Sequence, residues 1–78
     1  MSHINVTLRL AGQEVDLRLP EKMEIRKLIR ELDRIFGLNH QRVKYQIRVL
    51  NKGILLEEGQ HLAQTSVTTG DILEIEDL

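Results

Sequence analysis

The chain has no cysteine and no tryptophan, and its 78 residues include only one tyrosine, one phenylalanine and one proline. Without cysteine there is neither a disulfide framework nor a thiol nucleophile, which is compatible with a reducing cytoplasm. Two aromatic residues are too few for the base-stacking platform of a single-strand nucleic-acid binder. Leucine, isoleucine and valine must therefore fill the core.

Long apolar runs are also missing from the sequence. No segment approaches the ~20 apolar residues that span a bilayer, and the first ten residues, MSHINVTLRL, lack the apolar stretch of a signal peptide. With 41% hydrophobic and 29% charged residues, the composition is typical of a small globular protein. We expect a single cytoplasmic domain that spans residues 1–78.

The sequence shows no grouping of residues that is typical of a catalytic or metal site. His3, His40 and His61 have no partner at the spacing of metal ligands. The glycines are isolated turn formers, so none builds a phosphate-binding loop, and the two serines lie outside any nucleophile motif. We therefore expect a protein that is not an enzyme and that has no cofactor or metal.

The net charge of −1 is unevenly distributed along the chain. Residues 22–56 carry nine bases against three acids, whereas residues 57–78 carry six acids and no base. One interpretation is a basic face for nucleic acid or for an acidic partner. The alternative, which we favour, is that the acidic last strand pairs with the basic middle strand and neutralises it.

Two periodicities organise the first half of the chain. Apolar residues alternate with polar ones over 4–10 and again over 15–19, which predicts a β-hairpin with its turn at 11–13. From Glu24 to Phe36 the apolar spacing becomes that of an amphipathic helix, and Gly37 is suited to end it. Residues 38–44 are expected to form a connecting loop.

The second half predicts shorter strands. Residues 45–50 and 54–56 flank a turn that contains Gly53, with Ile47 and Val49 inward and Arg48 and Leu50 outward. A short turn follows around residue 62, and a last strand begins after residue 71. The resulting order of strand, strand, helix, strand, strand, short turn and strand predicts a two-layer α+β fold, the β-grasp, with a mixed sheet.

Several segments carry a more specific resemblance. The C-terminal stretch GQHLAQTSVTTGDILEI resembles the ubiquitin-like pattern of Gly59, Leu62, Val67, Gly70-Asp71, Leu73 and Ile75. The segments DLRLP (16–20), IRKLI (25–29), IRVLNKG (47–53) and TTGDILEI (68–75) are most similar to the small YukD-like (EsaB-like) proteins. Those proteins are encoded with the type VII secretion systems of Gram-positive bacteria, which export WXG100 proteins.

The resemblance implies a non-enzymatic, cytoplasmic accessory or regulatory component of that machinery, with a membrane or ATPase component as its protein partner. It also implies that the domain is not conjugated to other proteins. Ubiquitin-type transfer needs an extended tail ending in Gly-Gly, whereas this sequence ends in Glu76-Asp77-Leu78. A ubiquitin-like modifier or adaptor in another pathway and a nucleic-acid-binding domain remain alternatives, and self-association is left open.

Two surfaces are candidates for protein binding. In ubiquitin the sheet surface binds partners through a central apolar patch, and the resemblance gives that central position to Leu50, with Leu10 and Ile72 as companions and Arg48 beside them. Arg48 is expected to pair with Glu74 or Glu76. The second candidate is the helix stripe of Arg26, Arg30 and Arg34.

Overall fold

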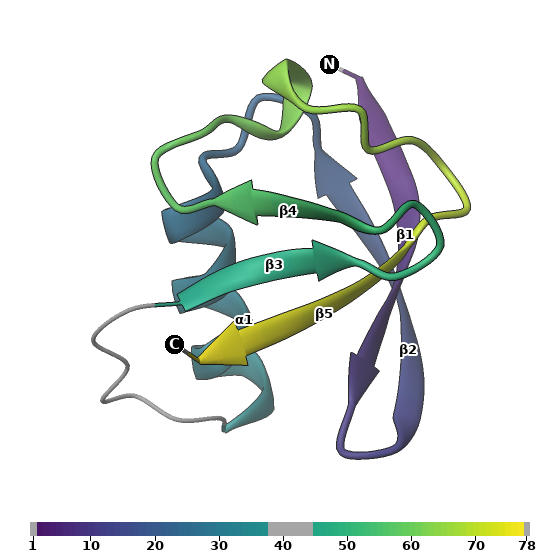
Figure 1. Ribbon diagram of the computed structural model, residues 1–78. Helices are drawn as coiled ribbons and strands as arrows, with labels where there is room; N and C mark the ends of the chain where they lie inside the picture. Colours follow the sequence, from purple (N-terminus) through teal and green to yellow (C-terminus); the bar gives the residue numbers. More distant parts are fainter. Residues whose placement is uncertain (1, 38–44, 78) are drawn as a thin grey trace.

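The computed structural model describes residues 2–37 and 45–77 and shows a mixed sheet with one helix across one face (Figure 1). The sheet order is β2-β1-β5-β3-β4, in which only the central β1–β5 pair is parallel. The predicted β-grasp is thereby confirmed. Its elements are β1 (His3–Leu10), β2 (Gln13–Pro20), α1 (Ile25–Phe36), β3 (Tyr45–Val49), β4 (Ile54–Glu57), the 3₁₀ turn η1 (Leu62–Gln64) and β5 (Ile72–Asp77).

The β1–β2 hairpin closes through a two-residue loop. Ala11 and Gly12 both have positive φ, 46° and 81°, and Leu10 pairs with Gln13 directly across the loop. Positive φ at both loop residues matches the twist of the two strands. Pro20 is the last residue of β2, as expected from its missing N–H.

Helix α1 starts without a side-chain cap and ends at a glycine. Glu24 occupies the N-cap position but makes no capping hydrogen bond, whereas Gly37 adopts the left-handed conformation and its N–H bonds the carbonyl of Asp33. The predicted helix boundaries are correct to one residue. The loop expected at residues 38–44 lies outside the described residues.

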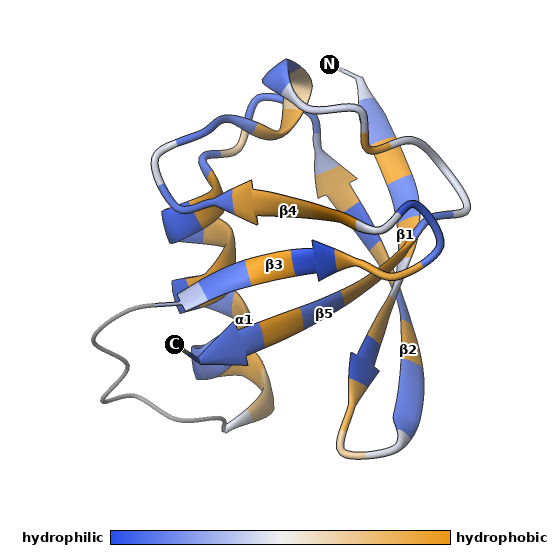
Figure 2. Cartoon of the chain, viewed as in Figure 1, coloured by the Kyte–Doolittle hydropathy of each residue, from blue (hydrophilic) through white to orange (hydrophobic). Residues whose placement is uncertain are grey.

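One apolar layer lies between the helix and the sheet. The alternating apolar residues of the strands and the stripe of α1 meet there. Figure 2 shows the hydrophobic residues as bands along the strands and α1. Ile75 is only half-buried but packs against the same layer. The buried residues are Ile4, Val6, Leu8, Leu19, Ile25, Leu28, Ile29, Leu32, Ile47, Val49, Leu56, Leu62, Val67 and Leu73.

The connection from β3 to β4 is longer than the one in the first hairpin. Strand β3 ends at Val49, whose carbonyl accepts hydrogen bonds from the N–H groups of Lys52 and Gly53. The Asn51 side chain reaches across this turn, where its oxygen accepts the N–H of Ile72 at 2.9 Å. The turn is thus attached to the start of β5.

Candidate protein-interaction surfaces

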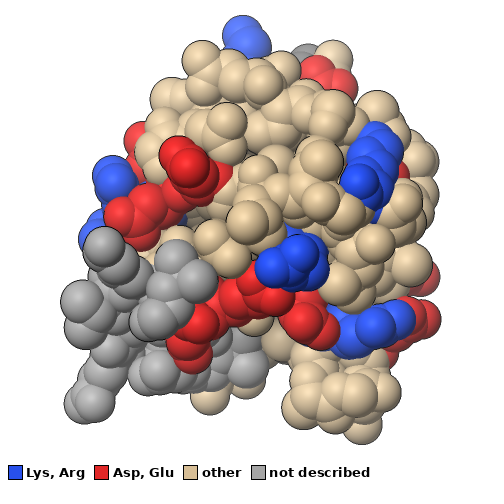
Figure 3. Space-filling view, viewed as in Figure 1, with Lys and Arg blue, Asp and Glu red and all other residues tan. Residues whose placement is uncertain are grey.

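The sheet face opposite α1 carries the outward side chains of the strands. Figure 3 views this face and shows carboxylates in a band along β5, basic side chains beside them, and largely uncharged atoms over the middle of β4. The strand registers place Arg48 between Leu55 of β4 and Glu74 of β5. Arg48 therefore has the central outward position on β3.

Arg48 is held by the neighbouring strand. Its Nε donates to Glu76 Oε2 at 2.8 Å, and Gln46 Nε2 donates to Glu76 Oε1 at 2.9 Å. Hydrogen bonds from Arg48 and Gln46 lower the pKa of the Glu76 carboxyl, and the same Arg48 contact raises the pKa of the guanidinium. The predicted pairing of Arg48 with the acidic last strand is confirmed, with Glu76 as the partner.

Leu50 lies just past the end of β3. The sequence predicts a strand over 45–50, but β3 ends at Val49, and Leu50 is a half-buried turn residue. Its N–H bonds the carbonyl of Ile72 at 2.8 Å, so Leu50 and Ile72 are adjacent at the end of β5. The predicted strand is one residue too long, because the four-residue turn begins with Leu50, and a place for Leu50 in a docking patch stays a prediction.

Leu10 lies on the other face of the sheet. It follows the alternation of Ile4, Val6 and Leu8, and its half-buried side chain packs against the core. It therefore cannot join Leu50 and Ile72 in one outward patch. The period-two pattern of β1 already carried this information.

The helix stripe is not a free cationic surface. Arg26 lies 3.5 Å from Glu24 and 3.6 Å from Glu58, and Arg34 lies 2.6 Å from Glu31. The hydrogen bond with Arg34 lowers the pKa of the Glu31 carboxyl. Arg30 is exposed and makes no ion pair with the described residues.

Sequence reasoning missed two exposed apolar residues. Leu55 is 45% exposed on β4, beside Arg48, and Ile35 is 60% exposed on α1. Leu55 follows Ile54 and precedes Leu56, so three consecutive apolar residues concealed the one that points outward. The alternation measured from buried Leu56 identifies it.

A shallow hollow of about 470 Å³ lies over the β1–β2 hairpin. Its polar lining includes Asn5, Thr7, Asp16 and Arg18, and the Thr7 hydroxyl donates to Asp16 Oδ1 at 3.2 Å. Within 2–37 and 45–77, no group of histidine, cysteine or acidic side chains is arranged to hold a metal ion. No described helix is long and apolar enough to cross a membrane.

Comparison with known proteins decides the family. The sequence model of the family described as "WXG100 protein secretion system (Wss), protein YukD" matches residues 3–75. The chain belongs to the YukD family. This family is associated with WXG100 secretion, and the resemblance seen in the sequence is thereby confirmed. A search of curated proteins gives no match.

Solved structures confirm the ubiquitin-like fold of this YukD family member. A chain from the structure described as "Molecular Mimicry of SUMO promotes DNA repair" has a TM-score of 0.78 at 14% identity, covering 97% of this chain and 92% of that chain. The ubiquitin-like domain of an Arabidopsis thaliana protein has a TM-score of 0.77 at 14% identity, covering 99% of this chain and 79% of that chain.

A third structure comes from a secretion complex. A chain of the MycP5-free ESX-5 inner membrane complex has a TM-score of 0.65 at 18% identity, and the match covers 97% of this chain but only 21% of that chain. At this identity the likeness shows a shared fold. A domain of the same shape is thus one part of a much longer chain in that complex.

Proposed function

We propose that this YukD family member is a non-enzymatic protein-interaction module that acts as a cytoplasmic accessory or regulatory component of the WXG100 secretion system. The observation that carries the proposal is the family match over residues 3–75. The ubiquitin-like domain in a chain of the ESX-5 inner membrane complex supports a protein partner in the secretion machinery.

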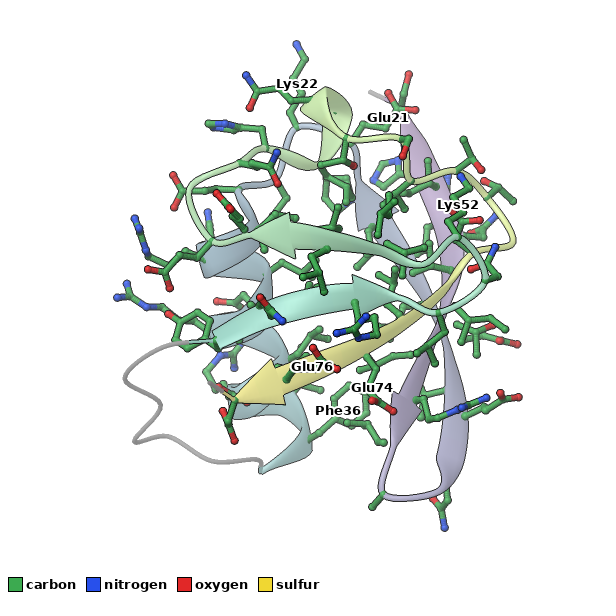
Figure 4. The ribbon with its side chains drawn as sticks, viewed as in Figure 1. Glu21, Lys22, Phe36, Lys52, Glu74 and Glu76 are labelled. Atoms are coloured by element: carbon green, nitrogen blue, oxygen red, sulfur yellow. The ribbon has the colours of Figure 1, made fainter. Side chains whose placement is uncertain are left out.

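The outer sheet face around Leu55 and Arg48 is the docking surface that the side chains favour. Leu55 presents a large apolar side chain that is 45% exposed, and Arg48 is fixed by Glu76 beside it. The buried core of a protein interface is more apolar than the rest of the surface, and arginine is enriched among the residues that contribute most to binding. Glu74 and Glu76 supply a charged rim along β5 (Figure 4).

A pull-down tests this proposal. The tagged domain is used to capture the membrane or ATPase component of the WXG100 secretion system from detergent extract. Leu55→Glu is expected to lower the recovery by at least about tenfold, because a buried unpaired carboxylate costs more than ~1.4 kcal/mol. Ile35→Glu is the matched control, since Ile35 is equally apolar and is exposed on α1, the helix that covers the other face of the sheet. Equal recovery with both variants would contradict the docking surface, and no recovery with the unaltered domain would contradict the function.

Conjugation is not part of the proposed function. The resemblance to YukD-like proteins implies a domain that is not attached to other proteins. Mass spectrometry of cell extracts is expected to show no lysine-linked adduct of this domain. Detection of such an adduct would replace the docking function with that of a modifier.

Nucleic-acid binding is the weaker alternative. Arg26, Arg34 and Arg48 each lie within 3.6 Å of a carboxylate, which offsets much of the basic charge of residues 22–56. We therefore expect no mobility shift of DNA or RNA even at low salt, where electrostatic binding is strongest. A shift that disappears on raising the salt concentration would support this alternative instead.

A further inference from the structure

Strand β2 forms one edge of the sheet and pairs with β1 alone. Because the hairpin loop has two residues, Leu10 and Gln13 form its closing hydrogen-bonded pair. Hydrogen-bonded pairs then recur at every second position along β2. The alternate residues must point their N–H and C=O groups away from β1, toward solvent. These residues are Glu14, Asp16 and Arg18.

The bonds of β1 confirm this alternation independently. The β1 residues that face these three outward residues point their N–H and C=O groups away from β2. These groups point toward the segment that leads into β5. Thr7 N–H donates to the Asp71 carbonyl at 2.9 Å, and Gly70 N–H donates to the Asn5 carbonyl at 2.8 Å. The N–H and C=O groups of the free edge are therefore identified residue by residue.

The two edges of the sheet differ in how they are covered. Strand β4 has only four residues, and the N–H of Glu57 at its end is bonded by the Gln60 side chain at 2.9 Å. Strand β2 has eight residues. Within the described parts of the chain, no residue outside β1 bonds the β2 backbone between Glu14 and Arg18. An uncovered edge of this length is a template for another strand.

The side chains on this edge complement a second copy of the same edge. Arg18 is exposed and makes no ion pair with the described residues, and Asp16 lies two positions away on the same face. We propose that two copies of this chain associate through antiparallel β2 strands, with Leu17 opposite Leu17 of the second copy. Each Asp16 then faces Arg18 of the second copy, and the two-fold axis produces this pair twice.

Charge selects this register over its neighbours. A register centred on Asp16 would place the two Asp16 carboxylates opposite each other, and one centred on Val15 would oppose Glu14 to Asp16. Like charges directly across a strand pair are destabilising. The register centred on Leu17 instead places opposite charges across from each other on the outer face. On the inner face it brings together the half-buried apolar residues Leu17 and Val15 of the two copies. The two sheets would become one continuous sheet.

This association is independent of the proposed function, because the Leu55–Arg48 surface is separated from β2 by β1 and β5. The test is analytical ultracentrifugation of the full chain over a dilution series. The unaltered protein is expected to show a dimer that dissociates on dilution. Arg18→Asp and Asp16→Arg are each expected to weaken the dimer at least about tenfold, since both create like-charge pairs.

The two single variants also provide a sharper measurement. An equimolar mixture of Arg18→Asp and Asp16→Arg is expected to form a heterodimer, because every facing pair then combines an aspartate with an arginine. The double variant Asp16→Arg/Arg18→Asp is expected to regain the homodimer. Arg30→Asp is the control, because it makes the same charge change on the exposed face of α1 and should dimerise normally. Circular dichroism checks that every variant is folded.

Four results would overturn the inference. The first is a monomer at every concentration up to roughly 1 mM, the weak end of specific affinity. The second is a dimer that all single variants form as well as the unaltered protein. The third is a dimer in which the amide protons of Asp16 and Arg18 exchange as fast as in the monomer. An unrelated extended peptide that pairs with β2 of a monomer would equally exclude the second copy as the occupant.

Discussion

The Nζ of Lys52 lies 2.7 Å from Oδ2 of Asp71, and this ion pair joins the β3–β4 turn to the residue that precedes β5. Asp71 is only 3% exposed, yet its carboxylate is fully engaged. It also accepts hydrogen bonds from the Asn51 side chain at 2.8 Å and from the Thr68 N–H at 2.9 Å. Figure 4 shows Lys52 beside the turn between β3 and β4.

Replacing Lys52 with methionine tests the contribution of this pair. The Lys52→Met variant keeps the length of the side chain but leaves a buried carboxylate without its cation. We expect the free energy of unfolding to fall by about 1–3 kcal/mol, as is usual for a lost hydrogen bond to a charged group. Urea denaturation measures the change. Lys22→Met, at an exposed position after β2, is the control and should leave the midpoint nearly unchanged.

The same site predicts how stability depends on pH. Burial raises the pKa of the Asp71 carboxyl, but the hydrogen bonds from Lys52, Asn51 and Thr68 more than offset this, so its pKa lies below the usual 3.8. Because the folded pKa is lowered, the stabilisation is complete above pH 3.8 and is lost as the pH falls through the folded value.

We therefore expect the free energy of unfolding to decrease below about pH 4 and to decrease less steeply in Asp71→Asn. Glu31 and Glu76 also have lowered pKa values and remain in both proteins, so the difference between the two curves isolates Asp71. Thermal melts between pH 2 and 7 make the comparison. Parallel curves for the two proteins would contradict the role given to Asp71.

The first hairpin contains a residue in an unfavourable conformation. Ala11 has a φ of 46°, in the left-handed region that asparagine and glycine tolerate better. Ala11→Asn is expected to raise the free energy of unfolding by about 0.5–1 kcal/mol. Gly12→Ala should lower it, because φ is 81° there although the space for a Cβ is open. If both substitutions shift the melting temperature in the same direction, turn geometry is not the cause.

The short 3₁₀ turn contributes an essential part of the core. Leu62 is 2% exposed, and its N–H bonds the carbonyl of Met23 just before α1. Leu62→Ala is expected to cost about 2–4 kcal/mol through the cavity it creates. Leu55→Ala provides the matched control, since the same atoms are removed from a side chain that is 45% exposed. Similar denaturation midpoints for the two variants would argue against this packing.

The fold could be predicted because periodicity alone distinguishes its elements. Alternation over 4–8 and helical spacing over 25–32 correctly identified the apolar side chains that are buried there, and the acidic composition of residues 74–77 correctly identified the neighbour of Arg48. These are local patterns that depend on secondary structure only. They needed no information on how far each turn extends.

The candidate surface was harder to predict, because it depends on one turn. The sequence pattern extends the third strand to Leu50, but the turn begins at that residue, and Arg48 lies opposite Glu74 near the middle of the sheet. Leu55 was hidden among apolar neighbours whose orientations could not be separated without the register. The sequence of α1 alone could not show that Arg26 is paired, because its partner Glu58 comes from a distant segment of the chain.

The parallel pairing of β1 with β5 has a consequence for folding kinetics. Thr7 and Ile72 are neighbours in the sheet although sixty-five positions separate them, so a long loop must close before the centre of the sheet exists. The β1–β2 and β3–β4 hairpins can form early from local contacts, but each exposes an apolar face until β5 joins them. We expect refolding to be slower than in helical proteins of this size, with substitutions in β5 acting mainly on the folding rate.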